Sequence, residues 1–87
     1  MYADLYSEEI TKKLAKLKKK DPIHYSKVCK KMDFILTEPS HNFKFLHHNM
    51  KGVNRVQLGH FVLVFVVDHK KKIVSFEDYN HHDNIYK

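Results

Sequence analysis

Histidine is the residue type with the most chemistry to offer here, because the chain has eight among 87 residues and imidazole titrates near neutral pH. His60, His81 and His82 stand at a turn and in a polar tail, and such groups can give or take a proton in catalysis. A surface histidine without a catalytic role is the commoner case, so both interpretations stay open. A metal site of His81, His82 and Asp83 is disfavoured, because adjacent residues rarely chelate one ion and the spacing of zinc motifs is missing.

Arg55 is the other residue singled out by its type. The chain has 16 basic and 10 acidic residues, a net charge of +6, and Arg55 is its one arginine. A guanidinium can bind a phosphate through two parallel hydrogen bonds, whereas lysines supply point charges. The excess of positive charge indicates a polyanionic partner: nucleic acid, an anionic membrane surface or an acidic protein. The alternative for Arg55 is an ordinary ion pair with Glu77 or Asp78.

Length and cysteine content narrow the class of protein. A chain of 87 residues is enough for one small domain, 1–87, and excludes a multidomain enzyme with a deep internal cleft. The single cysteine, Cys29, excludes an intrachain disulfide and a multi-cysteine zinc site, and it fits a reducing cytosol as a packed thiol. No stretch is long and apolar enough to cross a membrane. We therefore expect a soluble, cytoplasmic protein.

Two helices are predicted in the first half of the chain. After a possible short strand at Tyr2 to Tyr6, Ser7 can cap a helix that carries acidic residues in its first turn and apolar residues at helical spacing. The pair Asp21-Pro22 is a cap followed by proline at the first helical position, which predicts the start of a second helix. Pro39 ends it. A tight turn between the two predicts an antiparallel hairpin.

Strands are predicted in the second half, where residue types become β-branched and aromatic. The expected strands are Phe43 to Leu46, Asn54 to Leu58, Phe61 to Asp68 and Lys72 to Asp78. Short turns join them into an antiparallel meander, and the tail from Asn80 to Lys87 is short and polar. The fold class is α+β, an N-terminal short strand and an antiparallel helical hairpin packed on one face of a small antiparallel sheet.

This architecture leaves the other sheet face uncovered. That face and its rim can carry basic and polar side chains, which we expect to be Lys51, Arg55, Gln57, His60 and the tail histidines. A basic, uncovered sheet is a plausible cradle for nucleic acid.

The order of short segments in this chain resembles the RelE/ParE toxin superfamily. The resemblance covers essentially the whole chain, including the helical hairpin with its Asp21-Pro22 break. Its most specific pieces are Met50-Lys51-Gly52, Asn54-Arg55-Val56, Gly59-His60-Phe61 and His81-His82-Asp83-Asn84-Ile85-Tyr86. It implies the toxin of a type II toxin–antitoxin pair. Members similar to RelE cleave ribosome-bound messenger RNA without a metal or other cofactor, by attack of a ribose 2′-hydroxyl on the adjacent phosphate.

The resemblance also implies roles for individual residues. Arg55 stands where the family places a cation facing the scissile phosphate, and Lys51 is implied to contact a neighbouring phosphate. His82 occupies a tail position that is often arginine, and Tyr86 matches the tail tyrosine proposed as base or stacking group. Tyr86 could instead be an apolar peg that docks the tail.

The sequence departs from the family pattern in its central strand. Many members carry an arginine where this chain has Val62, and Gln57 stands where RelE has a lysine. A histidine-based variant similar to the YafQ branch is then implied, in which His82 is the general acid and His60 or His81 orients the hydroxyl or deprotonates it.

Three functions follow as hypotheses. The first is an endoribonuclease toxin acting on ribosome-bound mRNA. The second is a ParE-like toxin that binds a topoisomerase and has no nuclease chemistry, and the third is a degenerate RelE homologue that acts as a binding protein. All three imply an acidic, partly disordered antitoxin as partner. None implies a membrane, and contact with DNA is implied only through the antitoxin complex.

Overall fold

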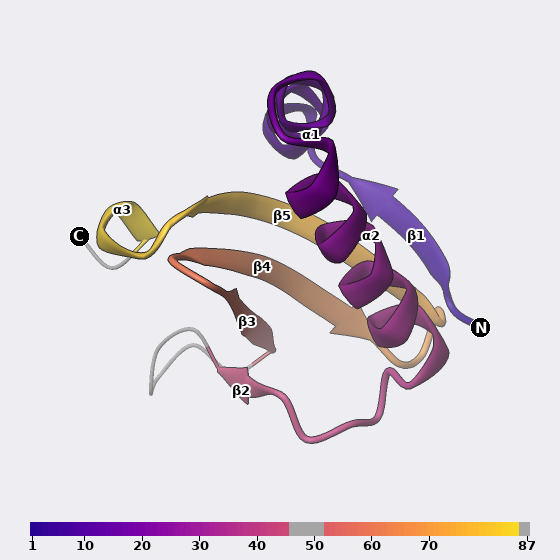
Figure 1. Ribbon diagram of the computed structural model, residues 1–87. Coiled ribbons are helices and arrows are strands. Elements are labelled where there is room, and N and C mark those ends of the chain that lie inside the picture. Colours follow the sequence, from indigo (N-terminus) through magenta and orange to yellow (C-terminus); the bar gives the residue numbers. More distant parts are fainter. Residues whose placement is uncertain (46–51, 86–87) are drawn as a thin grey trace.

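The computed structural model describes residues 1–45 and 52–85, which form a two-helix layer on one face of a sheet (Figure 1). The two long helices follow each other directly, and four of the five strands come after them. The elements are β1 (Ala3–Tyr6), α1 (Glu8–Lys20), α2 (Pro22–Thr37), β2 (Lys44–Phe45), β3 (Val53–Leu58), β4 (Phe61–Asp68), β5 (Ile73–His81) and α3 (His82–Ile85).

Side-chain caps start both long helices where the sequence predicts them. The Ser7 hydroxyl oxygen accepts a hydrogen bond from the Ile10 backbone N–H at 3.0 Å. The Asp21 carboxylate accepts one from the His24 N–H at 3.1 Å, and Pro22 follows it at the first helical position. These caps satisfy backbone donors that have no partner within the helix. The expected helical hairpin is therefore confirmed, and α2 ends at Thr37, before the proline predicted to stop it.

The strand order across the sheet is β1-β5-β4-β3-β2. Strands β2 to β5 form the expected antiparallel meander, and β1 pairs with β5 in parallel, from Ala3 opposite Ile73 to Tyr6 opposite Phe76. The α+β fold is confirmed, with a mixed rather than wholly antiparallel sheet. The parallel pair arises because the helical hairpin carries the chain away from β1 before the meander begins.

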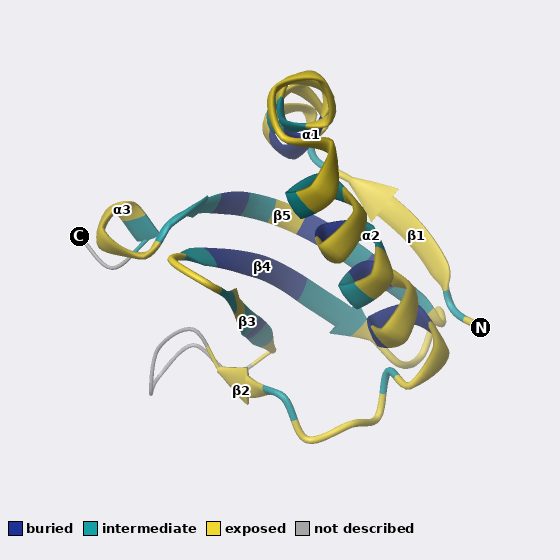
Figure 2. Ribbon diagram, viewed as in Figure 1, coloured by how far each residue is buried: buried dark blue, intermediate teal, exposed yellow. Residues whose placement is uncertain are grey.

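The core lies between the helices and the sheet, as the burial pattern of Figure 2 shows. Its fully buried side chains come from both helices, from β4 and from β5. Side chains alternate between the two faces of a strand, so Leu63 and Phe65 of β4 mark the helix side of the sheet. Val62 and Val64 point to the other side, and they are buried there as well.

A β-bulge in β5 changes which side chains face the helices. Val64 is opposite Asp78 and Phe65 is opposite Phe76, so Glu77 has no partner residue on β4. One extra residue reverses the alternation beyond it. Tyr79 is consequently opposite Leu63, on the helix side.

β4 has the predicted bounds, and β1 and β3 each start one residue away from the predicted position. β5 and β2 differ as well. β5 runs to His81 rather than Asp78, because its last residues continue to pair with the start of β4, and the tail then makes one helical turn, α3. β2 covers Lys44–Phe45 of the predicted Phe43 to Leu46, and Leu46 lies outside the described residues. In the part of the chain that the structure describes, no helix is long and apolar enough to span a bilayer.

Candidate active site

Three of the predicted catalytic residues meet at one end of the sheet. His60 lies in the turn between β3 and β4, and the last residue of β5, His81, stacks on it with ring centroids 6.1 Å apart and planes inclined by 13°. The backbone N–H of His82 donates a hydrogen bond to the carbonyl oxygen of His60 at 2.8 Å. Figure 1 shows α3 beside this turn. We call His60, His81 and His82 the histidine cluster.

The carboxylate of Asp83 joins the histidine cluster. Its two oxygens lie 3.7 Å from Nδ1 of His81 and 3.7 Å from Nδ1 of His82. All three side chains are substantially exposed, so these pairs contribute little to stability. Within residues 1–45 and 52–85, no three His, Cys, Asp or Glu side chains converge as ligands for a metal ion.

An aromatic layer supports the histidine cluster from the helix side. Phe61 stacks on Tyr79 with centroids 5.1 Å apart and planes inclined by 6°, and it meets the ring of His81 edge-on at 5.6 Å. Tyr79 is also hydrogen-bonded through its hydroxyl to Nε2 of His24, in the first turn of α2. The end of β5 is thereby tied to the turn of the helical hairpin.

The environment of Tyr79 keeps its hydroxyl neutral. Burial, and to a lesser degree the negative charge of Asp21, raises the pKa of Tyr79 to about 12, because both disfavour the phenolate. At neutral pH Tyr79 is therefore a structural hydrogen-bonding group.

Arg55 and Gln57 lie on the uncovered face of the sheet. Arg55 is opposite Val64 and Gln57 is opposite Val62, and both valines point away from the helices. Nε of Arg55 donates to the carbonyl oxygen of Phe45 at 3.1 Å, which directs the guanidinium toward β2. Nε2 of Gln57 donates to the Gly59 carbonyl oxygen at 3.0 Å, which places this amide beside the β3–β4 turn.

The predicted ion-pair partners of Arg55 lie on β5, which β4 separates from the strand of Arg55. Asp78 binds Nζ of Lys13 on α1 at 2.7 Å instead, and Glu77 is the bulged residue. Val62, at the position where many RelE/ParE members carry arginine, is only 1% exposed. An apolar side chain therefore fills that position.

The prediction that all these residues share the uncovered face of the sheet is wrong. His81 is opposite Phe61 and lies on the helix side, whereas Arg55 and Gln57 lie on the uncovered side. Gln57 reaches the rim at Gly59, beside the histidine cluster, whereas Arg55 is turned toward β2. Lys51 and Tyr86 lie outside the described residues.

Sequence reasoning did not single out His24, Phe61 or Tyr79 as neighbours of this site. His24 follows the Asp21-Pro22 signal and therefore had to stand near the hairpin turn. Its contact with Tyr79 depends on the bulge at Glu77, for which the local sequence gives no clear signal.

Solved structures with the same fold come from toxin–antitoxin complexes. The chain superposes on the toxin of the intact Escherichia coli RelBE complex with a TM-score of 0.79, at 20% identity, over 93% of this chain and 96% of that one. The RelE–RelB complex of Pyrococcus horikoshii gives a TM-score of 0.71 at 20% identity, over 92% and 93% of the two chains. The fold is thus that of a RelE toxin.

Sequence comparison gives the family itself. The chain is 42% identical over 88 aligned positions to a Methanocaldococcus jannaschii protein provisionally named toxin RelE4, covering all of this chain and 93% of that protein. It is 40% identical over 87 positions to an uncharacterized Methanosarcina mazei protein, covering 99% and 100% of the two chains. No family model matches the sequence. The chain belongs to the RelE toxin family.

Proposed function

We propose that this protein is the toxin of a toxin–antitoxin pair and an endoribonuclease that cleaves ribosome-bound mRNA in the cytoplasm. The observation that carries the proposal is the 42% identity over the whole chain to a RelE relative. A cluster of three histidines at the rim of a sheet face that carries Arg55 supports it, since these residue types supply what cleavage by a 2′-hydroxyl needs.

The reaction transfers a phosphoryl group within the RNA, from the 5′-oxygen of one nucleotide to the 2′-oxygen of the nucleotide before it. The ribose 2′-oxygen attacks the adjacent phosphorus as a base removes its proton, a bond from O2′ to phosphorus forms, and the bond from phosphorus to O5′ breaks. The leaving O5′ takes a proton from an acid. The products are a 2′,3′-cyclic phosphate and a 5′-hydroxyl, and no oxidant or reductant is required.

We assign the roles that the resemblance to the RelE family implies. His82 serves as the acid, and His60 or His81 serves as the base or orients the hydroxyl. Arg55 stabilises the charge on the phosphate oxygens, with Gln57 between it and the rim. Arg55 and Gly59 are four positions apart, about 13 Å along a strand, so we place the phosphate near Gln57, between the guanidinium and the imidazoles. The guanidinium turns toward it when Nε of Arg55 releases the carbonyl oxygen of Phe45. Lys51 and Tyr86 complete the proposed site as a phosphate contact and a stacking group.

The proposed partner that controls this activity is a cognate antitoxin. The comparison structures include complexes of RelE with RelB from Escherichia coli and Pyrococcus horikoshii. A net charge of +6 favours an acidic, partly disordered partner for this chain.

The test is induction of the chain in a bacterial host, followed by primer extension on a reporter mRNA. The parent should arrest growth and cut the message in phase with codons. His82→Ala and Arg55→Ala should each lower cleavage by about 100-fold or more, the usual effect of removing an acid or a charge-stabilising group. Tyr86→Ala and His60→Ala should lower it as well.

His69→Ala is the matched control. His69 lies in the β4–β5 turn at the opposite end of the sheet and contacts the Tyr2 hydroxyl at 3.0 Å, so its replacement should leave cleavage unchanged. Growth arrest with intact mRNA and altered DNA supercoiling would replace the nuclease with a topoisomerase-binding toxin. A parent that neither arrests growth nor cuts mRNA would leave only a binding protein.

A further inference from the structure

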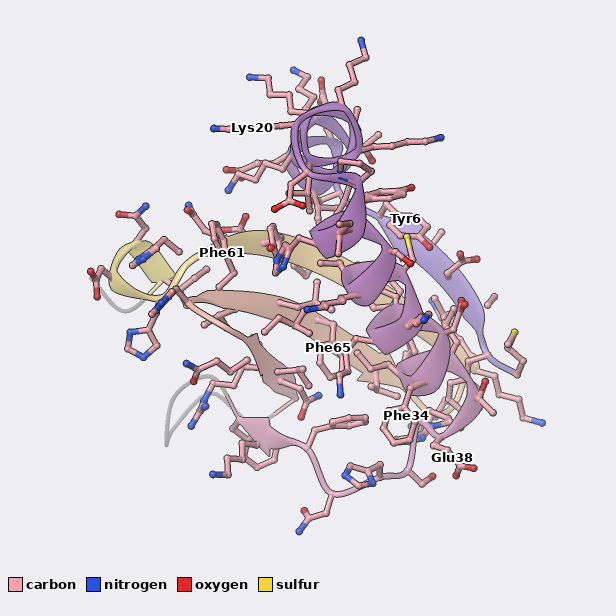
Figure 3. All side chains as sticks on the ribbon, viewed as in Figure 1. Tyr6, Lys20, Phe34, Glu38, Phe61 and Phe65 are labelled. Carbon is pink, nitrogen blue, oxygen red and sulfur yellow. The ribbon has the colours of Figure 1, made fainter. Side chains whose placement is uncertain are left out.

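A groove runs between α1 and the end of the sheet, on the helix side and next to the histidine cluster. It consists of two adjoining cavities of about 440 and 320 Å³, which share Leu17, Lys20 and Phe61 as lining residues. His60 lines the first cavity and Lys16 the second. Figure 3 shows Lys20 projecting from α1 at the end of the molecule where Phe61 lies. We call this feature the α1 groove.

Lysines of α1 form one wall of the groove. Lys13, Lys16 and Lys20 are spaced by three and four residues and so lie on one face of the helix. Burial disfavours the charge of Lys13, but hydrogen bonds to Asp78 at 2.7 Å and Glu9 at 3.3 Å outweigh it and raise its pKa. Lys13 is thus held by carboxylates, whereas Lys16 and Lys20 are exposed and can bind an added anion.

The remainder of the groove is mostly apolar. Leu17 and Phe61 are half-buried and line both cavities, and one face of Phe61 is already stacked on Tyr79. Asp21 brings a negative charge to one edge, where its carboxylate caps α2. Two exposed lysines against one capping carboxylate leave the groove positive.

We propose that the α1 groove binds a single-stranded RNA segment next to the nucleotide that is cleaved. The inference rests on the proposed function, because it continues the RNA from the histidine cluster. His60 carries the argument: its ring stacks on His81 and also lines the groove. A strand whose phosphate lies near Gln57 passes around the end of the sheet at the β3–β4 turn, and its neighbouring nucleotide then reaches the groove beside His60.

The chemistry of the groove suits a nucleotide better than an acidic peptide. Single-strand sites combine cations that follow the backbone with aromatic and apolar surfaces that take the bases. Lys16 and Lys20 are about 6 Å apart along the helix axis, close to the separation of successive phosphates in an extended strand. The apolar floor accommodates a base, whereas a run of carboxylates would leave it uncovered.

The experiment measures binding of a fully 2′-O-methylated RNA of about ten nucleotides, a length within known single-strand site sizes, by fluorescence anisotropy at several salt concentrations. This probe has no free 2′-hydroxyl and cannot be cut by the proposed route. Replacing Lys16 and Lys20 together by Gln should reduce the slope of log affinity against log salt by about 1.4, and the affinity at about 0.1 M salt by about 25-fold. An oligomer that lacks bases should bind at least about five-fold more weakly than the RNA.

The control removes the same charge elsewhere. Lys30 on α2 and Lys71 in the β4–β5 turn are exposed and lie outside the groove, so the Lys30→Gln, Lys71→Gln double variant should keep most of the affinity. Equal losses in the two double variants would overturn the groove, and so would poly-glutamate that competes as well as the RNA. Because the readout is binding, the two proposals fail separately. A chain that binds the RNA through the groove but never cuts mRNA would sink the nuclease proposal, whereas equal losses in the two double variants of a chain that does cut mRNA would sink only the groove.

Discussion

The raised pKa of Tyr79 predicts that the free energy of unfolding falls at alkaline pH. Its pKa is raised from 10.0 to about 12 in the folded chain. Between these values the unfolded chain has lost the phenolic proton while the folded chain retains it, so the free energy of unfolding falls as pH rises. At about 1.4 kcal/mol for each pH unit, this shift corresponds to roughly 3 kcal/mol. This contribution is fully present below pH 10 and is lost by about pH 12.

The Tyr79→Phe variant isolates the contribution of Tyr79 to the pH dependence of stability. At neutral pH it loses the hydrogen bond to His24 and should be less stable by about 1 kcal/mol. At high pH it has no proton to lose, so its stability should fall less steeply than that of the parent. The two curves should cross near pH 11, where the linkage term has grown to about 1 kcal/mol. Other titrating groups are common to both proteins and cancel in the difference.

The assay is urea unfolding followed by far-ultraviolet circular dichroism, repeated at intervals from neutral pH to about pH 12, the folded-state pKa of Tyr79. A stability difference between parent and variant that stays constant over this range would refute the reasoning. It would mean that Tyr79 titrates alike in the folded and unfolded chains. The difference in tyrosinate absorbance between the folded parent and the folded Tyr79→Phe variant gives an independent reading of the same pKa, because the other four tyrosines are common to both.

Two further predictions concern the ends of elements near the site. Ser7→Ala should destabilise the protein by about 1 to 2 kcal/mol, because it removes the side-chain cap on the Ile10 N–H. The urea unfolding midpoint measures this loss, with Ser26→Ala, at an exposed site on α2, as the control. A loss no larger than that of the control would contradict the prediction. Gly59→Ala should cost about 1 to 2 kcal/mol, since Gly59 has φ +65°. Gly59→Asn should cost less by the same measurement, and an equal loss would argue against backbone strain.

The helices and the central strand could be predicted because their signals are local. Asp21-Pro22 and Pro39 mark helix boundaries through backbone chemistry alone, and β4 is recognisable from its continuous apolar residues. The parallel pairing of β1 was not predictable in this way. It depends on where the whole helical hairpin returns the chain, which no short segment specifies.

The candidate site was predictable in its residue types and less so in its geometry. The histidines near Gly59 and in the tail were identified from their chemistry, and the structure places His60, His81 and His82 together. The side of the sheet on which His81 lies was not, because it follows from the unpaired residue Glu77. Strand alternation read from the sequence cannot anticipate an interruption of this kind.

The pairing of β1 with β5 has a consequence for how the chain is made. The Ser7 hydroxyl meets the carbonyl of a residue 70 positions later, and β1 has no sheet to join until β5 is synthesised. The helical hairpin can form early from local contacts, but the β1–β5 edge depends on a distant pairing, which forms slowly. The histidine cluster in turn needs the last residues of β5. We therefore expect a nascent chain to carry no assembled site while most of β5 is still inside the ribosome that makes it. If the proposed mRNA cleavage is correct, the chain cannot cut the message from which it is being translated until β5 has left the ribosome.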